Sequence, residues 1–312
     1  MVIDTNYSLD VNYPRPSVFI RGFKNIMKSG FVTIVGRPNV GKSTILNKLL
    51  GTKLVAVTPK PQTTRHKVLG ILTEKDYQIV FTDTPGIFKP KYELQKVMVK
   101  HAISTLEDTD LTLVVVEPFR METDIVEKLS RPAILAINKT DLLKDKPKLL
   151  SLMDEYKNFK LIQEIVLTSA LHNEGIDELK QELVKLLPDE ELYYPSDYLS
   201  DKNERFFVAE IIREKIFLLY GQEVPYATTV VIEEFKEREQ GKYFIRAVIY
   251  VERRSEKMII IGKSGNAIKE LGKTARKDIE LRIGHPIYLE LWVKVRKGWR
   301  RNLRDVKEFG YG

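Results

Sequence analysis

A single segment, GRPNVGKS at residues 36–43, restricts this 312-residue chain to a narrow set of folds. It matches the pattern GxxxxGK[ST], in which backbone N–H groups surround phosphates, a lysine reaches the outer phosphates and a hydroxyl ligates magnesium. The apolar run FVTIV at 31–35 predicts a buried strand, and residues 42–50 have helical apolar spacing. We therefore expect a strand, a phosphate-binding loop and a helix N-terminus, with Lys42 and Ser43 facing the ligand.

Three later segments indicate which base accompanies the phosphates. They are DTPG at 83–86, NKTD at 138–141 and SAL at 169–171, and the first two follow apolar runs typical of strands. The carboxylate of Asp141 can accept from the two donors on the guanine edge while Asn138 bonds on the other side; adenine would leave the carboxylate unpaired. NKxD alone is common as a polar turn, but here it follows a predicted strand, where α/β sheets bind ligands. The four segments together predict a guanine-nucleotide site.

The alternation of elements predicts an α/β fold for the first part of the chain. Strand-like runs alternate with helical stretches between residues 31 and 187, which is typical of a mainly parallel sheet wrapped by helices. VLGILT at 68–73 predicts an antiparallel edge strand beside 77–82. We therefore expect a P-loop GTPase domain at 27–187, and the prolines and acids of 188–200 predict a linker.

Residues 201–312 follow a different pattern, which predicts an α+β domain. A helix at 204–219, two alternating strands, a short helix ending in GKSG at 262–265, a helix at 266–283 and a strand at 286–296 give the order α-β-β-α-α-β. This order resembles a type II KH domain, in which the GxxG loop clamps the backbone of about four nucleotides. We expect this domain to bind RNA through GKSG.

Charge is concentrated in the same region. Of the net charge of +8, residues 201–312 contribute 24 Lys and Arg against 17 Asp and Glu, while residues 1–200 are nearly balanced. Cationic side chains interleaved with an aromatic residue are typical of surfaces that bind single-stranded RNA. A milder excess of positive charge would be explained by solvated surface residues alone. Trp299 is equally compatible with packing at the domain edge. The predicted RNA-binding residues are Ile261, Gly262, Lys263, Ser264, Gly265, Lys269, Lys273, Arg276, Lys294, Arg296, Lys297, Trp299 and Arg300.

Cysteine content, apolar runs and the N-terminal residues indicate the cellular compartment in which the chain functions. It contains no cysteine, which excludes disulfides and thiol catalysis and agrees with a reducing cytoplasm. Its apolar runs fall short of the roughly 18 residues of a membrane span, so we expect a soluble protein. Residues 1–26 read as an N-terminal extension without the features of a signal peptide, and we hypothesise that Met27 is the natural start.

The motifs taken together resemble the Era family of bacterial GTPases, which join a G domain to a C-terminal type II KH domain. The likeness covers residues 27–311 and rests on GRPNVGKST, KPQTTRH, DTPGI, NKTDLL, IIIGKSGNAIKELG and LELWVKVRKGW. It implies a GTP-hydrolysing switch that binds the 3′ end of 16S ribosomal RNA and acts in assembly of the 30S subunit. It also implies a cytoplasmic monomer, with contact at the periphery of the inner membrane left open.

The same resemblance implies roles for individual residues. Thr64, with Thr63 as the alternative, resembles the switch threonine that closes on Mg²⁺, and Asp83 resembles the residue that holds this ion through water. The Gly86 amide resembles the group that contacts the γ-phosphate, and Asn39 matches an asparagine that ligates K⁺ in related GTPases. Ile87 stands where many GTPases carry a water-orienting glutamine, so we expect slow intrinsic hydrolysis.

The predicted nucleotide-binding residues are Gly36, Asn39, Val40, Gly41, Lys42, Ser43, Thr44, Asp83, Gly86, Asn138, Lys139, Asp141, Ser169, Ala170 and Leu171. Magnesium is assigned to Ser43, Thr64 and Asp83, and catalysis to Lys42, Thr64, Gly86 and Asn39. Two hypotheses stay open: a switch in which hydrolysis resets RNA binding, and an RNA-binding adaptor whose nucleotide is mainly structural. A third hypothesis, a G domain that serves membrane transport or tRNA modification, is disfavoured because the sequence shows neither a membrane span nor a further cofactor domain.

Overall fold

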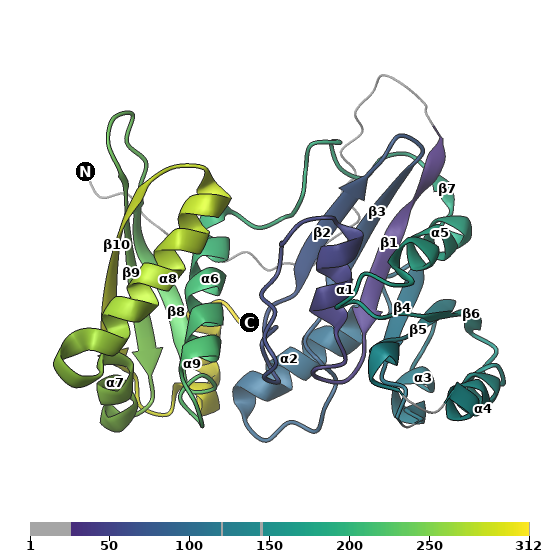
Figure 1. Cartoon of the computed structure of the whole chain (residues 1–312), viewed down its shortest axis with the longest axis horizontal. Helices are drawn as coiled ribbons and strands as arrows, with labels where there is room; N and C mark the ends of the chain where they lie inside the picture. Colours follow the sequence, from purple (N-terminus) through teal and green to yellow (C-terminus); the bar gives the residue numbers. More distant parts are fainter. Residues whose placement is uncertain (1–25, 120, 144–145, 312) are drawn as a thin grey trace.

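The computed structural model describes residues 26–119, 121–143 and 146–311. The predicted N-terminal extension, with the hypothesis that Met27 is the natural start, therefore concerns residues outside the described part of the chain, apart from Ile26. Two domains lie side by side, with the C-terminal end of the chain between them (Figure 1).

The first domain is built on one twisted sheet. Its strands are β1 (Met27–Val35), β2 (Val68–Thr73), β3 (Tyr77–Asp83), β4 (Leu111–Val116), β5 (Ala133–Ile137) and β6 (Ile162–Leu167), in the spatial order β2-β3-β1-β4-β5-β6. The pairs β3-β1, β1-β4, β4-β5 and β5-β6 are parallel, and β2 pairs with β3 in the antiparallel sense. The predicted mainly parallel sheet with an antiparallel edge strand is thus confirmed.

Helices cover both faces of this sheet. They are α1 (Lys42–Leu49), α2 (Glu93–Ser104), α3 (Thr123–Val126), α4 (Lys146–Tyr156) and α5 (Ile176–Leu186), with a 3-10 helix η1 at Thr140–Leu142. Alternate residues of the central strands enter two separate cores: Ile34 packs with α1 and α5, while its neighbour Val35 packs with α2, α3 and α4. Parallel strands buried on both faces have continuous apolar sequences, and for this reason runs such as LTLVVV could be recognised.

The predicted linker at 188–200 is bound to the first domain along much of its length. A two-residue strand β7 (Asp189–Glu190) pairs with the start of β1. Gln78 accepts from the backbone N–H groups of Tyr193 and Tyr194, and Ile71 of the edge strand β2 donates to the carbonyl of Leu199 at 2.9 Å. The linker therefore satisfies backbone groups of the sheet edge, which would otherwise remain open to other chains.

The second domain has the predicted order α-β-β-α-α-β. Its elements are α6 (Glu204–Leu219), β8 (Thr229–Lys236), β9 (Tyr243–Val251), α7 (Arg254–Ile261), η2 (Lys263–Gly265), α8 (Asn266–Ile283) and β10 (Ile287–Val295). The sheet order is β10-β9-β8, with β10 parallel and β8 antiparallel to β9. Helices α6 and α8 pack on one face of this sheet (Figure 1).

The end of the chain connects the domains. It forms η3 (Trp299–Arg301) and α9 (Leu303–Glu308), both of which contact α2 of the first domain. Leu94 and Met98 of α2 share one buried apolar cluster with Trp299, Val306 and Tyr311. Among the described residues, no helix has the length and apolar character needed to cross a membrane.

Candidate nucleotide and RNA binding sites

The loop between β1 and α1 has the geometry that phosphate binding requires. Gly41 has φ +103°, and a Cβ on it would lie 2.2 Å from Nδ2 of Asn138. Gly86 is equally constrained, because a Cβ there would lie 2.6 Å from the backbone nitrogen of Pro38. Both positions therefore require glycine: the Asn138 side chain approaches the loop at Gly41, and Gly86 brings the DTPG backbone against Pro38.

Lys42 is held at the centre of this loop. Its ammonium group donates to the carbonyl oxygens of Gly36 at 3.1 Å and Arg37 at 3.0 Å. Burial lowers the pKa of Lys42 to about 8, and the negative charges of Asp83 and Glu122 oppose that shift. A buried ammonium group surrounded by carbonyl oxygens is ready to pair with an anion, which would offset the cost of burial.

The three residues assigned to magnesium meet at one point. Ser43 Oγ donates to Asp83 Oδ2 at 2.9 Å and lies 2.8 Å from Thr64 Oγ1. Asp83 Oδ1 is buried and has no hydrogen-bond partner among the described residues, and burial raises the pKa of this carboxyl. Two hydroxyls and one carboxylate with an unused oxygen fit Mg²⁺, which typically takes one or two carboxylates together with phosphates and water.

The geometry also distinguishes Thr64 from Thr63. Thr63 Oγ1 donates to the carbonyl of Lys60 at 2.8 Å and contacts Thr58, away from the Ser43 hydroxyl. Thr64, in contrast, lies within hydrogen-bond distance of both Ser43 and Asp83. Of the two alternatives, the structure favours Thr64.

The opposite end of the site is built from the NKTD and SAL segments. Asn138 Oδ1 accepts from the Ala170 N–H at 3.0 Å, and its Nδ2 donates to the carbonyl of Val40 at 2.8 Å. Ser169 Oγ donates to Asp141 Oδ1 at 2.5 Å, which fixes the carboxylate, and Oδ2 lies 3.9 Å from Nε2 of His172 and can still accept from a ligand. Lys139 has φ +63° and pairs with Glu117.

A cavity of about 440 Å³ joins the two ends. It falls within the roughly 300–1,000 Å³ of small-molecule sites. Its lining includes most of the predicted nucleotide-binding set: Asn39, Gly41, Lys42, Ser43, Thr44, Gly86, Asn138, Lys139, Asp141, Ala170 and Leu171. Val40 and Ser169 are buried behind this lining, and the Gly36 carbonyl accepts from the N–H of Ile87 at 3.1 Å.

Apart from Thr64 and its alternative Thr63, one part of the cavity wall was not assigned from the sequence. Residues 53–66, which we call the switch segment, run as an irregular loop between α1 and β2, and 56–59 and 62–64 line the cavity. Asn39 donates from Nδ2 to the carbonyl of Pro59 at 2.8 Å, which ties this segment to the phosphate loop. A long connection without regular structure was a usable signal, because such loops in compact domains are often functional.

The GKSG loop projects from the second domain. Lys263 and Ser264 are exposed, and Ser264 has φ +53°. Lys269, Lys273 and Arg276 follow at helical spacing on α8 and are exposed, while Leu271 and Ala275 of the same helix are buried. The predicted loop and helix cations are therefore available to a ligand.

The tail residues differ from the prediction. Trp299 is fully buried and donates from Nε1 to the carbonyl of Ala227 at 2.9 Å, so its prediction as an RNA-stacking residue is wrong. Its ring instead fills the interface between the domains, in the cluster with Leu94 and Met98.

Three of the predicted tail cations are held in ion pairs within the protein. Arg300 pairs with Glu252 at 2.6 Å, Arg296 pairs with Asp305 and Glu308, and Lys294 pairs with Glu233 at 2.8 Å. These pairs reduce the charge that the tail offers to RNA. Lys297 is exposed.

Comparison with known proteins agrees with the two-domain arrangement. Residues 31–139 match the family model described as 50S ribosome-binding GTPase, and residues 223–300 match that of the KH domain. GTPase Era of Syntrophus aciditrophicus is 46% identical over 298 residues, which cover 93% of this chain and 97% of that protein. GTPase Era of Thermoanaerobacter sp. is 44% identical, with coverage of 91% and 96%.

The chain belongs to the Era family of GTPases. Two solved Era structures each have a TM-score of 0.87 and 42% identity and cover 92% of this chain. One is an Aquifex aeolicus Era variant bound to GDP and aluminium fluoride, covered over 100% of its length. The other is Era in complex with MgGDPNP and nucleotides 1506–1542 of 16S ribosomal RNA, covered over 99%. The family, the fold and the GTPase activity predicted from the sequence are confirmed.

Proposed function

We propose that this Era-family GTPase is a switch whose KH domain binds the 3′ end of 16S ribosomal RNA during assembly of the 30S subunit. The observation that carries the proposal is the exposed GKSG loop in a KH domain that is packed directly against the nucleotide-binding domain. The Era complex with MgGDPNP and nucleotides of 16S ribosomal RNA, which aligns with this chain across both domains, supports it.

On the nucleotide side, each residue has a task that its position permits. Lys42 pairs with the outer phosphates, the Gly86 N–H contacts the γ-phosphate and Asp141 accepts from guanine. Ser43, Thr64 and Asp83 would hold Mg²⁺, which neutralises charge on the phosphates when it is bound. Thr64 senses the γ-phosphate, since it lies on the irregular switch segment rather than on a helix or strand.

Hydrolysis is slow in the absence of a further activating group. Ile87 is buried and has no polar side chain with which to orient water, although it follows DTPG directly. We further propose that Asn39 ligates K⁺ near the phosphates, where a cation would offset the charge that develops during hydrolysis. Its Nδ2 donates to the carbonyl oxygen of Pro59, but its side-chain oxygen can still coordinate a cation.

On the RNA side, backbone N–H groups of GKSG bind the sugar-phosphate, and Lys263 with the cations of α8 neutralises neighbouring phosphates. The protein acts as a cytoplasmic monomer that presents this surface to the RNA. Of the four predicted tail cations, Lys297 adds to this surface, because Lys294, Arg296 and Arg300 are paired within the protein.

The experiment that tests the switch is a measurement of RNA affinity in two nucleotide states. An oligonucleotide with the 16S 3′-terminal sequence is titrated against the protein loaded with GDPNP and against the protein loaded with GDP. We expect tighter binding in one state, because a ligand shifts an equilibrium only through differential affinity. Equal affinity in both states would favour the alternative function, an RNA-binding adaptor whose nucleotide is structural.

A further inference from the structure

The switch segment contacts the KH domain at several points along its length. Lys53 pairs with Glu214 of α6 at 2.7 Å, and the other carboxylate oxygen of Glu214 accepts from the Val57 N–H at 3.0 Å. The Lys60 ammonium group donates to the carbonyl oxygens of Phe217 and Tyr220 at the C-terminal end of α6. Polar side-chain and backbone groups of the switch segment are thus hydrogen-bonded or ion-paired to the second domain.

The contacts are densest on either side of Thr64. On one side, the Thr63 carbonyl accepts from Arg213, a buried arginine of α6 that also pairs with Glu210. On the other side, Arg65 is 2% exposed and extends into the KH domain. Its guanidinium donates to three carbonyl oxygens of one turn, those of Thr228 at 2.7 Å, Pro225 at 3.0 Å and Tyr226 at 3.1 Å.

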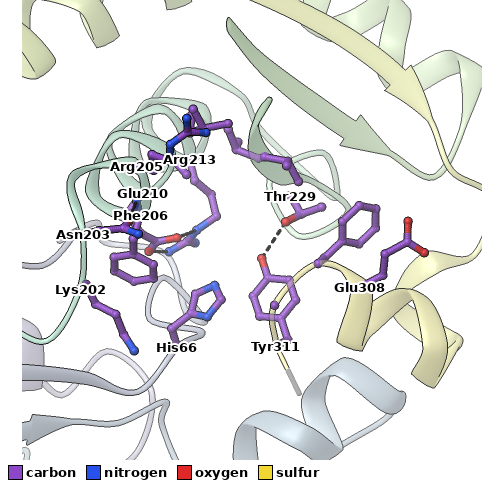
Figure 2. Close-up of a pocket in the computed structure, with 16 residues that line it drawn as sticks. His66, Lys202, Asn203, Arg205, Phe206, Glu210, Arg213, Thr229, Glu308 and Tyr311 are labelled. Carbon is purple, nitrogen blue, oxygen red and sulfur yellow. Dashed lines mark hydrogen bonds and ion pairs between the residues drawn. The ribbon is translucent and has the colours of Figure 1, made fainter. Parts of the chain in front are cut away.

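The next residue, His66, continues the interface. Its ring stacks on that of Tyr311 with centroids 4.4 Å apart, and meets the edge of Phe206 at 5.2 Å. Figure 2 shows His66 between α6 on one side and Tyr311 on the other, with the Tyr311 hydroxyl bonded to Thr229 at 2.9 Å. Residues 63, 65 and 66 on either side of Thr64 therefore all contact the second domain, Thr63 through its backbone carbonyl and Arg65 and His66 through their side chains.

We propose that Arg65 is a positioning residue for GTP hydrolysis, which fixes the Thr64 hydroxyl beside Ser43 and Asp83 by binding the KH domain. An irregular loop loses conformational entropy when it is ordered, and contacts outside the nucleotide site must offset that loss. Arg65 supplies them at the residue adjacent to Thr64, with a fork of donors that lysine cannot reproduce. This inference rests on the role proposed above for Thr64.

The contacts between the switch segment and the KH domain couple the GTPase site to the RNA-binding domain. Because the KH domain helps to order Thr64, a change at α6 or at residues 225–228 alters the GTPase site as well. Coupling between two binding sites is reciprocal, so the ligand of either domain affects the affinity of the other domain. The readout of this coupling is turnover rather than GDP affinity, because the role proposed for Thr64 depends on the γ-phosphate, which GDP lacks.

The test compares full-length Arg65→Met, Arg65→Lys, Thr64→Ala and the double variant Thr64→Ala/Arg65→Met. Arg65→Met is expected to lower kcat for GTP at least tenfold, since small misplacements near reacting groups can cost about a hundredfold, while GDP affinity changes less than about twofold. Arg65→Lys should recover part of the loss. In the Thr64→Ala background, Arg65→Met should lower kcat no further, because its effect acts through Thr64.

Arg238→Met, an exposed arginine on the β8–β9 turn, serves as the matched control and should leave kcat unchanged. If Arg65→Met does not fold, Lys60→Met, which removes a half-buried charge from the same segment, replaces it and should lower kcat about threefold with GDP affinity retained.

Unchanged kcat in the folded Arg65 or Lys60 variant, with Thr64→Ala impaired, would overturn this inference alone. So would additive losses in the double variant. Normal turnover in Thr64→Ala would instead remove the proposed role of Thr64, and this inference with it.

Discussion

Asn138 donates a hydrogen bond from its side-chain amide to the carbonyl oxygen of Val40, which lies 98 residues earlier in the chain, at 2.8 Å. The bond joins the NKTD turn, proposed to recognise the base, to the loop proposed to bind the phosphates. Asn138 is buried, and its oxygen also accepts from the N–H of Ala170. The two ends of the nucleotide site are therefore held at a fixed separation, as recognition of a whole nucleotide requires.

Asp141→Asn is expected to move base preference from guanine toward xanthine. The substitution exchanges an acceptor for a donor on the side chain, and the xanthine edge exchanges a donor for an acceptor. Ser169, which bonds to Asp141, can still bond to the amide oxygen, so the position of the side chain should be retained. Competition between GTP and XTP measures the shift, which we expect to be at least about tenfold. Continued preference for GTP would contradict the assignment.

Potassium is expected to raise the turnover of GTP above the rate in sodium at equal ionic strength. A monovalent ion at Asn39 would offset charge between the phosphates, in the place of an arginine side chain. The comparison is repeated with Asn39→Ala, in which the two salts should give the same rate. Equal rates in both salts for the unmodified protein would exclude a potassium site.

Replacing Lys263 and Ser264 together with Asp is expected to separate the two domain functions. Both residues are exposed, so folding should survive. Two carboxylates would repel phosphates at the loop, and affinity for an oligonucleotide of the 16S 3′ end should fall at least tenfold, about 1.4 kcal/mol, with a shallower salt dependence. GTP affinity should stay the same. Loss of GTP binding with RNA affinity retained would show that the loop had been assigned to the wrong function.

Trp299→Phe is expected to affect stability and to leave RNA binding intact. The indole is buried between the domains, and phenylalanine would leave the Ala227 carbonyl without its 2.9 Å hydrogen bond. Loss of a partner for a buried polar group costs about 1–3 kcal/mol in the free energy of unfolding. Urea unfolding and RNA titration of the same sample measure both quantities. A variant of normal stability with weakened RNA binding would contradict this expectation and indicate that Trp299 contacts RNA.

Much of the fold was predictable because its signals are local. Buried parallel strands have continuous apolar sequences, and for this reason β4 and β5 could be recognised from LTLVVV and PAILAI. The helices α6 and α8 begin and end at the expected residues, since their apolar positions repeat with the helical period. The phosphate loop was recognisable for a related reason, because its chemistry depends on residue types at fixed short spacing.

What the sequence determined by itself was thus each domain, its nucleotide or RNA loop and the residue types that carry the chemistry. The tertiary structure decided which distant side chains meet: that Thr64 rather than Thr63 faces Asp83, that Trp299 is buried, and that Arg65 binds the KH domain. Adjacent threonines are chemically alike, and a tryptophan followed by arginines has the same composition whether it faces RNA or another domain. Only tertiary packing, within the first domain for Thr64 and between the domains for Trp299 and Arg65, removes these alternatives, because the deciding hydrogen bonds join residues that lie 19, 72 and 163 positions apart in the chain.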